Sequence, residues 1–574
     1  MKKKHVVASA VLATSMIFTS LGGASGAEAE KKLQQAKNPD FAPAMVNKND
    51  NKLFDNLEAM LTEKKATDKV EVIIQFDESM ANQKAHKAIL NKVGKFETKF
   101  KFDKAVNGVA ATLTKKQIEQ LERIPFVKSV EYDAPVKAFN GTANTWFGTE
   151  KARADYGLTG DGDGNVNSYS KDDQVVAVID TGIDASHVDL DEGKVIGWKD
   201  LVNNRTAPYD DQGHGTHVAS TVAGDGDGNP THKGVAPGAA LVGVKVLDSQ
   251  GSGSMSNVTA GIEWAVENKD VYGIEVLSLS LGTSASSDGT DSTSQAVNNA
   301  VDAGLAVTVA AGNAGPSKKT IGSPGAAEKV ITVGAGADLG EGGFFLAYFS
   351  SRGETADGRI KPDVVAPGYN LTAAEANSGS GYVTYSGTSM ATPFTAGTIA
   401  LMLEANPSLT PNQVKNIIAD TAEDWGPSGI DVDYGHGFLD GFAAISDAGN
   451  LSGTNIAKPN HFAEQNSLGG SGAADTYQFT VDNTDYPAAV TLIIPDWQPG
   501  FLWWGSEPDF DVYLYNPSGQ QVAKAEGTER QETLTFNPTA TGTYTLKVSS
   551  YSGDGSYYLD LSAGTNGLNL TSNQ

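Results

Sequence analysis

The chain has 574 residues, more than one domain of about 100–200 residues holds, and we expect two to four folded units. It contains no cysteine, which excludes disulfide bonds and cysteine-ligated metals. Its formal net charge of −26 disfavours nucleic acid as a partner and favours solubility and cation binding.

The N-terminus carries the pattern of a secretory signal peptide. A basic head over 2–4 precedes an apolar run over 6–21 and the small-x-small cleavage site Ala27-Glu28-Ala29. The run is shorter than the roughly 20 residues that cross a bilayer. We expect a signal peptide over 1–29 and an extracellular monomer with no membrane attachment in its mature form.

A polar, irregular linker is expected over 30–68, followed by a small folded unit over 69–139. In this unit the pattern predicts strand, helix, strand, strand, helix and strand, a β-α-β-β-α-β order that indicates a ferredoxin-like α+β fold. The predicted elements are 70–76, 79–94, 96–102, 108–113, 115–123 and 127–132.

Strongly apolar strands alternate with helical patterns over 140–448. The strand candidates are 175–179, 241–246, 276–279, 306–310 and 330–333. Continuous apolar strands separated by helices indicate a buried, mostly parallel, doubly wound α/β sheet with helices on both faces.

The last part begins with a Gly-, Asn- and Ser-rich linker over 449–470. Alternating short strands follow over 471–563 without a helical pattern, which predicts a β-sandwich or jelly roll, and a tail covers 564–574. The strand candidates are 477–481, 489–494, 512–515, 533–536, 542–548 and 556–561.

Two local patterns place an acid and a base at candidate catalytic positions. Asp180 follows the apolar strand in VVAVIDTGID, at the kind of strand end where doubly wound sheets bind ligands. His214 lies among glycines in DDQGHGTHVAS, before a helix that we expect to begin near His217, itself a buried supporting residue. A strand-end Asp is often only a cap and a single His is usually structural, so neither pattern decides alone.

Two further patterns supply a nucleophile and an oxyanion donor. Ser389 in YSGTSMATP begins a helix of small and apolar residues, where the helix dipole favours developing negative charge. Asn313 in VTVAAGNAG follows another apolar strand, and its amide could meet an oxyanion beside the Ser389 N–H. Alone, these would be an N-cap serine and a turn asparagine.

Together, the blocks DTGID, GHGTHVAS, AAGN and GTSMATP resemble in content and order the signature of the subtilisin-like serine proteases, or subtilases. The resemblance covers 140–448 and implies a serine endopeptidase with catalytic Asp180, His214, Ser389 and Asn313. Two neighbouring positions, Glu354 and Phe394, depart from the usual pattern without touching these four.

The same resemblance implies a binding site for extended polypeptide. Two segments would pair with the substrate backbone, and three small residues would line a roomy apolar S1 pocket that selects large hydrophobic P1 residues. The pairing segments are Gly251, Ser252, Gly253 and Ser280, Leu281, Gly282; the pocket residues are Ala310, Gly312 and Gly322.

The flanking parts also resemble known modules. The unit 69–139 resembles the inhibitory propeptide of subtilases, an intramolecular inhibitor, and we expect self-cleavage between Phe139 and Asn140. The segment 471–563 resembles the pre-peptidase C-terminal jelly-roll domain of some secreted proteases. As the protein has no disulfides, structural calcium is the expected cofactor, with Asp225 and Asp227 or Asp509 and Asp511 as candidate ligands.

Other enzyme classes fit less well. Lipases and esterases place the nucleophile in G-x-S-x-G, whereas Ser389 lies in G-T-S-M-A, and the chain has no H-E-x-x-H zinc motif. A catalytically inactive binding protein remains an alternative, although such proteins generally lose a catalytic residue and all four are present. Casein hydrolysis, with and without a serine-directed inhibitor, separates these readings.

Overall fold

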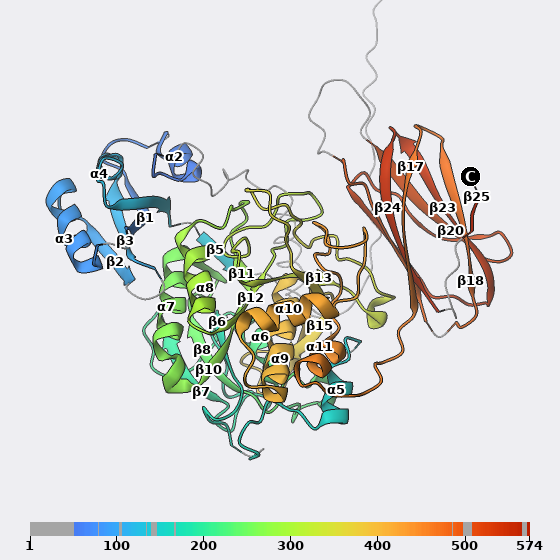
Figure 1. The fold of residues 1–574 in the computed structure, drawn as a ribbon, viewed down its shortest axis with the longest axis horizontal. Helices are drawn as coiled ribbons and strands as arrows, with labels where there is room; N and C mark the ends of the chain where they lie inside the picture. Colours follow the sequence, from blue (N-terminus) through green and yellow to red (C-terminus); the bar gives the residue numbers. More distant parts are fainter. Residues whose placement is uncertain are drawn as a thin grey trace, which may run out of the picture. The chain divides into compact units, whose positions relative to one another are not determined.

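The computed structural model describes residues 51–62, 64–77, 80–102, 106–133, 135–138, 146–165, 168–484, 486–497, 508–564 and 571–573. The expected signal peptide and the expected junction at Phe139 and Asn140 lie outside these ranges. Three structured parts follow one another along the chain, from blue to red in Figure 1. No helix in the described ranges has both the length and the apolarity to cross a membrane.

The first part is the expected small α+β unit. Its antiparallel sheet has the order β2-β3-β1-β4, as in ferredoxin-like folds. The expectation of irregular chain over 30–68 is wrong at its end, because a helix there buries Leu57 and Leu61 in the core of this unit. The elements are α2 (Asp55–Thr62), β1 (Lys69–Phe76), α3 (Asn82–Val93), β2 (Glu97–Phe102), β3 (Gly108–Thr114), α4 (Lys115–Leu121), β4 (Val127–Tyr132) and then β5 (Pro135–Ala138).

The second part contains a seven-stranded parallel sheet in the order β14-β13-β12-β10-β6-β8-β7. Its strands are β6 (Val175–Asp180), β7 (Val195–Asp200), β8 (Ala240–Lys245), β10 (Ile274–Leu279), β12 (Ala306–Ala310), β13 (Ile331–Gly336) and β14 (Val364–Pro367). The helices are α5 (Thr149–Tyr156), α6 (His214–Ala223), α7 (Met255–Tyr272), α8 (Ser292–Asp302), α9 (Thr388–Ala405), α10 (Pro411–Thr421) and α11 (Gly441–Ala448). Short elements connect them: β9 (Ser252–Ser254), β11 (Leu281–Gly282), β15 (Leu371–Ala374), β16 (Tyr382–Tyr385), η1 (Pro230–His232) and η2 (Leu339–Glu341).

Alternate residues of β6 face opposite sides of this sheet. Val176 and Val178 belong to a buried cluster with residues of α6 and α9, whereas Val175 and Ala177 belong to a second cluster with residues of α7 and α8. Helices therefore cover both faces, and the expected doubly wound α/β fold is confirmed.

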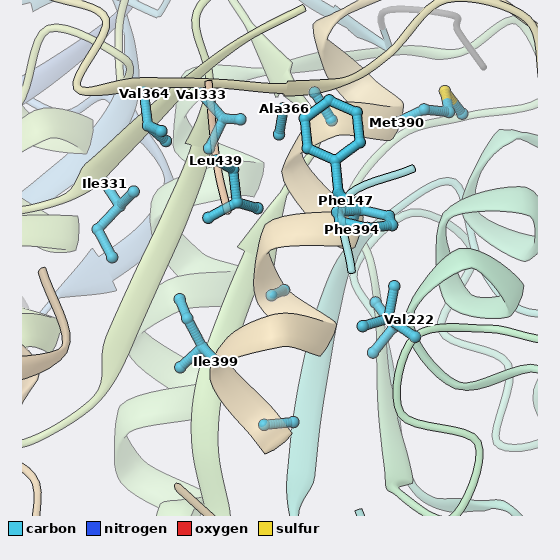
Figure 2. Close-up of a cluster of buried hydrophobic side chains, with 14 of the residues drawn as sticks. Phe147, Val222, Ile331, Val333, Val364, Ala366, Met390, Phe394, Ile399 and Leu439 are labelled. Atoms are coloured by element: carbon cyan, nitrogen blue, oxygen red, sulfur yellow. The ribbon is translucent and has the colours of Figure 1, made fainter. Parts of the chain in front are cut away.

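Helix α9 runs through the core of the second part. Its side chains are buried all round from Thr388 to Leu403. Figure 2 shows three of them in one cluster with residues of β13 and β14, namely Met390, Phe394 and Ile399 with Ile331, Val333 and Val364. A helix packed on every side cannot shift easily, so the first turn of α9 is a rigid platform.

The third part is a sandwich of two antiparallel sheets, β17-β24-β19-β22 and β21-β20-β23-β18-β25, which confirms the expected all-β domain. The linker prediction is wrong over Asn460–Leu468. This edge strand buries only Leu468 and is held by main-chain pairing with β24, so it lacks an apolar signal. The strands are β17 (Asn460–Leu468), β18 (Ala474–Val481), β19 (Ala488–Ile493), β20 (Asp509–Tyr515), β21 (Gln521–Ala525), β22 (Gln531–Phe536), β23 (Gly542–Ser552), β24 (Gly555–Ala563) and, in the expected tail, β25 (Thr571–Asn573).

Candidate active site

Polar residues follow the carboxyl ends of three adjacent parallel strands. Asp180 ends β6, Ser280 comes directly after β10, and Asn313 lies three residues after β12. This edge is where open α/β sheets bind their ligands. The sheet therefore brings together residues that are well separated in the sequence.

Asp180 and His214 form a buried hydrogen-bonded pair. The Nδ1 atom of His214 lies 2.8 Å from Oδ1 of Asp180, and each side chain is 1% exposed. The same carboxylate oxygen accepts the N–H of Thr181 at 2.7 Å. His214 is the first residue of α6, three residues earlier than the expected helix start, so the rigid helix fixes the imidazole beside the strand end.

Ser389 is the second residue of α9 and is fully buried. Its hydroxyl donates to the carbonyl of Ser280 at 3.1 Å, and the hydroxyl of Ser280 donates to the carbonyl of Ser389 at 2.6 Å. These reciprocal bonds join the first turn of α9 to the end of β10. Free N–H groups and the dipole of the helix create a positive potential at this turn.

Asn313 is oriented by Thr388, a residue that the sequence patterns did not single out. Its Oδ1 accepts the N–H of Thr388 at 2.9 Å and the Thr388 hydroxyl at 3.1 Å. A backbone N–H can only donate, so the amide oxygen must face Thr388 and the amide NH₂ must point elsewhere. The only sequence signal for Thr388 is its place immediately before Ser389.

His217 is buried, as expected, and packs behind His214. Its Nε2 lies 3.1 Å from the carbonyl of Leu371. Burial, reinforced by the neighbouring His214, lowers the pKa of His217 to about 3, so this imidazole stays neutral. It supports the site without exchanging protons near neutral pH.

The two expected pairing segments flank a strand from the end of the first part. Strand β5 pairs antiparallel with β9 on one side and with β11 on the other, in the order β11-β5-β9. Lys137 is opposite Ser252 and Gly282, and Ala138 is opposite Leu281. The chain thus places one of its own extended segments between these two edges.

Close packing explains the small residues expected to line the S1 pocket. Ala310 ends β12 and is buried. Gly312 has a φ of +108°, which disfavours side chains, and a Cβ atom on Gly322 would lie 2.0 Å from the carbonyl oxygen of Thr283. A larger residue at Gly312 would strain the backbone next to Asn313, and one at Gly322 would displace the backbone at Thr283.

Comparison with known proteins agrees with this geometry. Residues 171–437 match the model of the subtilase family, residues 59–139 match that of peptidase inhibitor I9, and residues 473–550 match that of the bacterial pre-peptidase C-terminal domain. Serine protease AprX of Bacillus subtilis is 40% identical over 383 residues, which cover 62% of this chain and 84% of AprX. The chain belongs to the subtilase family.

Other relatives of this subtilase extend the comparison. Subtilisin E of Bacillus subtilis is 36% identical over 397 residues, covering 68% of this chain and 94% of that protein. The thermostable alkaline protease of Halalkalibacterium halodurans is 35% identical over 333 residues, covering 58% and 81%. The chain is therefore a subtilisin-like serine endopeptidase that is made as a zymogen with its own inhibitory propeptide.

The propeptide docks on the subtilase domain through two buried carboxylates at helix N-termini. Both oxygens of Glu131 accept the N–H of Ser292, the first residue of α8, at 2.7 and 2.9 Å. Asp133 accepts the N–H of Ser256 in the first turn of α7 at 2.6 Å. Burial and the nearby Asp291 carboxylate raise the pKa of Glu131 well above its usual value, and burial raises the pKa of Asp133.

Neither predicted calcium pair gathers three acidic ligands. Among the described residues, the His, Cys, Asp and Glu side chains whose ligand atoms all lie within 4.8 Å of one another form one group of three: Asp161, Asp163 and Asp173. Asp225 and Asp227 lie outside it, with the Asp227 N–H donating to Asp225. Asp509 and Asp511 also lie outside it. Burial and then the charge of Asp511 raise the pKa of Asp509, and burial and then the charge of Glu526 raise that of Asp511.

Proposed function

We propose that this subtilase is a secreted endopeptidase that cleaves polypeptides through Ser389, His214 and Asp180. The observation that carries the proposal is the buried 2.8 Å contact between His214 Nδ1 and Asp180 Oδ1. Because the carboxylate accepts, Nδ1 bears the proton and Nε2 carries the lone pair that takes the proton of Ser389. Asp180, which is buried, then stabilises the imidazolium.

In the first step the Ser389 hydroxyl turns from the Ser280 carbonyl toward His214. Its oxygen attacks the scissile carbonyl carbon while His214 takes the proton. The developing oxyanion accepts hydrogen bonds from the Asn313 NH₂ and from the Ser389 N–H. Because Thr388 binds the amide oxygen of Asn313, the NH₂ group is free to face the oxyanion. His214 then protonates the leaving amine, and water releases the acyl group from Ser389 by the same route in reverse.

Substrates bind as an additional strand between β9 and β11. This follows from β5, which occupies that place with main-chain pairing on both sides. Ala310, Gly312 and Gly322 then border the P1 side chain, and their small size favours large hydrophobic residues. Rates on peptides that differ only at P1 test this preference: Phe and Leu should exceed Lys and Asp, and the reverse order would refute it.

Maturation occurs by self-cleavage between Phe139 and Asn140. Strand β5 pairs up to Ala138 with the edge that begins at Leu281, so the next residue is in position to become P1. A phenylalanine there agrees with an apolar pocket. The segment 1–29 directs secretion before this step, and the mature protease is an extracellular monomer that binds polypeptides and no nucleic acid.

Structural calcium belongs to the proposal, with Asp161, Asp163 and Asp173 as the ligand set. Three carboxylates offer the hard oxygen ligands that calcium prefers, and their mutual repulsion favours a bound cation. Asp173 is 3% exposed and accepts the N–H of Ser170 at 2.6 Å, which holds one ligand rigidly. Bound there, calcium would join Asp161 and Asp163 to Asp173, which lies just before β6.

Casein hydrolysis by the propeptide-free protein tests the proposed activity. We expect hydrolysis that a sulfonyl fluoride abolishes, with the label recovered on Ser389 by peptide mapping. Hydrolysis that the reagent does not affect would contradict the assigned nucleophile. Absence of hydrolysis after propeptide removal would favour a binding protein.

A further inference from the structure

The loop that carries Asn313 is framed by one neighbouring segment, Leu346–Arg352. The N–H of Ser351 donates to the carbonyl of Gly312 at 2.8 Å, and the Ser351 hydroxyl accepts the N–H of Ala314 at 3.1 Å. The N–H of Gly315 donates to the carbonyl of Phe349 at 2.9 Å. Asn313 therefore sits in a stretch whose main chain is fastened on both sides of it.

The C-terminal domain holds both that segment and the loop itself. Gln531 donates through Nε2 to the carbonyl of Leu346 at 2.7 Å and accepts from Arg352 Nη2 at 2.6 Å. Arg530 donates through Nη1 to the carbonyl of Pro316 at 3.1 Å, three residues beyond Asn313. The start of β22 therefore contacts the Asn313 loop directly through Arg530 and indirectly through Gln531, which binds the segment Leu346–Arg352.

Arg530 is held in place by a buried bidentate pair with Asp433 of the protease domain. Its Nη1 and Nη2 lie 2.5 and 2.9 Å from the two carboxylate oxygens. Arg530 is 1% exposed and Asp433 is 2% exposed. Burial alone would raise the pKa of Asp433, but Arg530 and then Arg352 hold it below its usual value, so the carboxylate stays charged. A pair shielded from water in this geometry is rigid and specific.

Apolar contacts accompany these polar ones. Ile493 of the sandwich joins the protease-domain cluster that contains α9, and Ala489 packs with Phe345. A Cβ atom on Gly343 would lie 2.5 Å from that of Ala489, so the two domains approach too closely there for any side chain. This is the packing of a permanent interface rather than of a loosely tethered module.

We propose that the C-terminal domain stays docked in the active protease and that Arg530 is a positioning residue, which holds the Pro316 carbonyl and thereby fixes Asn313 at the oxyanion. The inference rests on the proposed function of Asn313. It assigns to the sandwich domain a part in catalysis that acts without touching substrate.

A double-mutant cycle on the full-length, self-processed protein tests this inference. N313A should lower kcat by about 10²–10³, the range known for such a donor from subtilisin itself. R530Q should lower kcat about tenfold with little change in KM, because a displaced donor weakens the transition state more than the bound substrate. In the background of N313A, adding R530Q should lower kcat by no more than about twofold, since both substitutions act on one interaction.

Two further variants serve as controls for the double-mutant cycle. R530K retains the positive charge but not the bidentate geometry of the guanidinium group, so its kcat should lie between those of the wild type and R530Q. If R530Q does not mature, R530K replaces it in the cycle. D560N replaces the carboxylate that accepts from the Gly426 N–H and the Tyr434 hydroxyl across the same interface with an amide, which has one acceptor oxygen, and leaves the Arg530 bond to Pro316 unaltered. It should lower the melting temperature while kcat stays within twofold.

The outcomes separate the two proposals. A normal kcat for N313A would overturn the proposed function of Asn313. Given a slow N313A, three results would overturn the positioning role alone. These are a normal kcat for R530Q (or for R530K, where it replaces R530Q in the cycle), losses that multiply in full in the double variant, and a D560N variant as slow as R530Q.

Discussion

Two parts of the chain dock on the same subtilase domain by opposite electrostatic means. The propeptide brings Glu131 and Asp133 to the N-termini of α8 and α7, where partial charges of the helices face buried carboxylates. The C-terminal domain brings Arg530 to Asp433, a full charge against a full charge. The first contact depends on carboxylates whose pKa values are raised, and the second on a carboxylate whose pKa is lowered.

This difference fits a propeptide that must dissociate from the protease domain and a C-terminal domain that stays bound to it. Burial and the nearby Asp291 disfavour the charged form of Glu131, so the contact of this carboxyl group weakens when the group ionises. A buried bidentate ion pair has no such release, and breaking it leaves a charge without a partner. We therefore expect a propeptide contact that weakens as the pH rises above the ordinary pKa of a glutamate. The C-terminal contact should weaken only when the pH falls far enough to protonate Asp433.

The largest expected effect concerns the site that both parts adjoin. S389A, processed in trans by wild-type enzyme and repurified, should lose about 10⁶-fold in kcat on a peptide substrate, because the nucleophile is gone. The matched change S378A, at an exposed serine, should leave kcat unchanged. Activity of S389A within a hundredfold of the wild type would show that another residue is the nucleophile.

Breaking the C-terminal contact should cost stability. In D433N the guanidinium groups of Arg530 and Arg352 stay buried without their counter-charge, and we expect a loss of about 3–5 kcal/mol. Thermal unfolding of the sulfonyl-fluoride-inhibited enzyme measures it. The control D302N breaks the exposed pair with Lys329 and should cost less than about 1 kcal/mol. Equal effects would mean that the interface does not hold the buried pair.

Calcium removal should destabilise the protease domain. An ion present at about a hundred times its Kd adds about 2.7 kcal/mol, so a chelator should lower the melting temperature of the inhibited enzyme. D163N should abolish this difference, whereas D227N, in the other acidic loop, should preserve it. A melting temperature that the chelator leaves unchanged would show that the protein has no stabilising calcium ion.

Propeptide affinity should fall as pH rises. Docking raises the pKa of Glu131 from an ordinary value near 4.5. Below that value the group is protonated in both states and has no effect. Between the ordinary and the raised pKa docking takes up a proton, so affinity falls by up to about tenfold per pH unit for this group. Inhibition constants of the isolated propeptide should follow this slope.

E131Q should flatten that slope, leaving the smaller contribution of Asp133, whose pKa is also raised. The control E119Q changes a surface glutamate that pairs only weakly with Lys115 at 3.9 Å, and it should keep the wild-type slope. An unchanged slope in E131Q would contradict the assigned origin of the pH dependence.

The sequence predicts the parts of this molecule that have local signatures. Asp180 and Asn313 could be found because each follows an apolar strand, and Ser389 because it begins a buried helix. Helix α2 and strand β17 could not, since a two-leucine helix and an edge strand with one buried residue carry almost no hydrophobic pattern.

The interfaces were also beyond reach of the sequence. Arg530 and Asp433 are 97 positions apart and neither lies in a motif. Glu131 looks like an ordinary strand residue until Ser292 of α8 is placed beside it. Contacts between domains depend on how finished folds fit together, so only the three-dimensional structure shows which charges meet.

Intact-mass analysis of the secreted wild type and of S389A tests the central claim most directly. We predict a wild-type product that begins at or near Asn140 and retains the sandwich domain, and an S389A product that still carries the propeptide. A wild-type product without the sandwich domain, or an S389A protein that matures normally with no protease added, would contradict it.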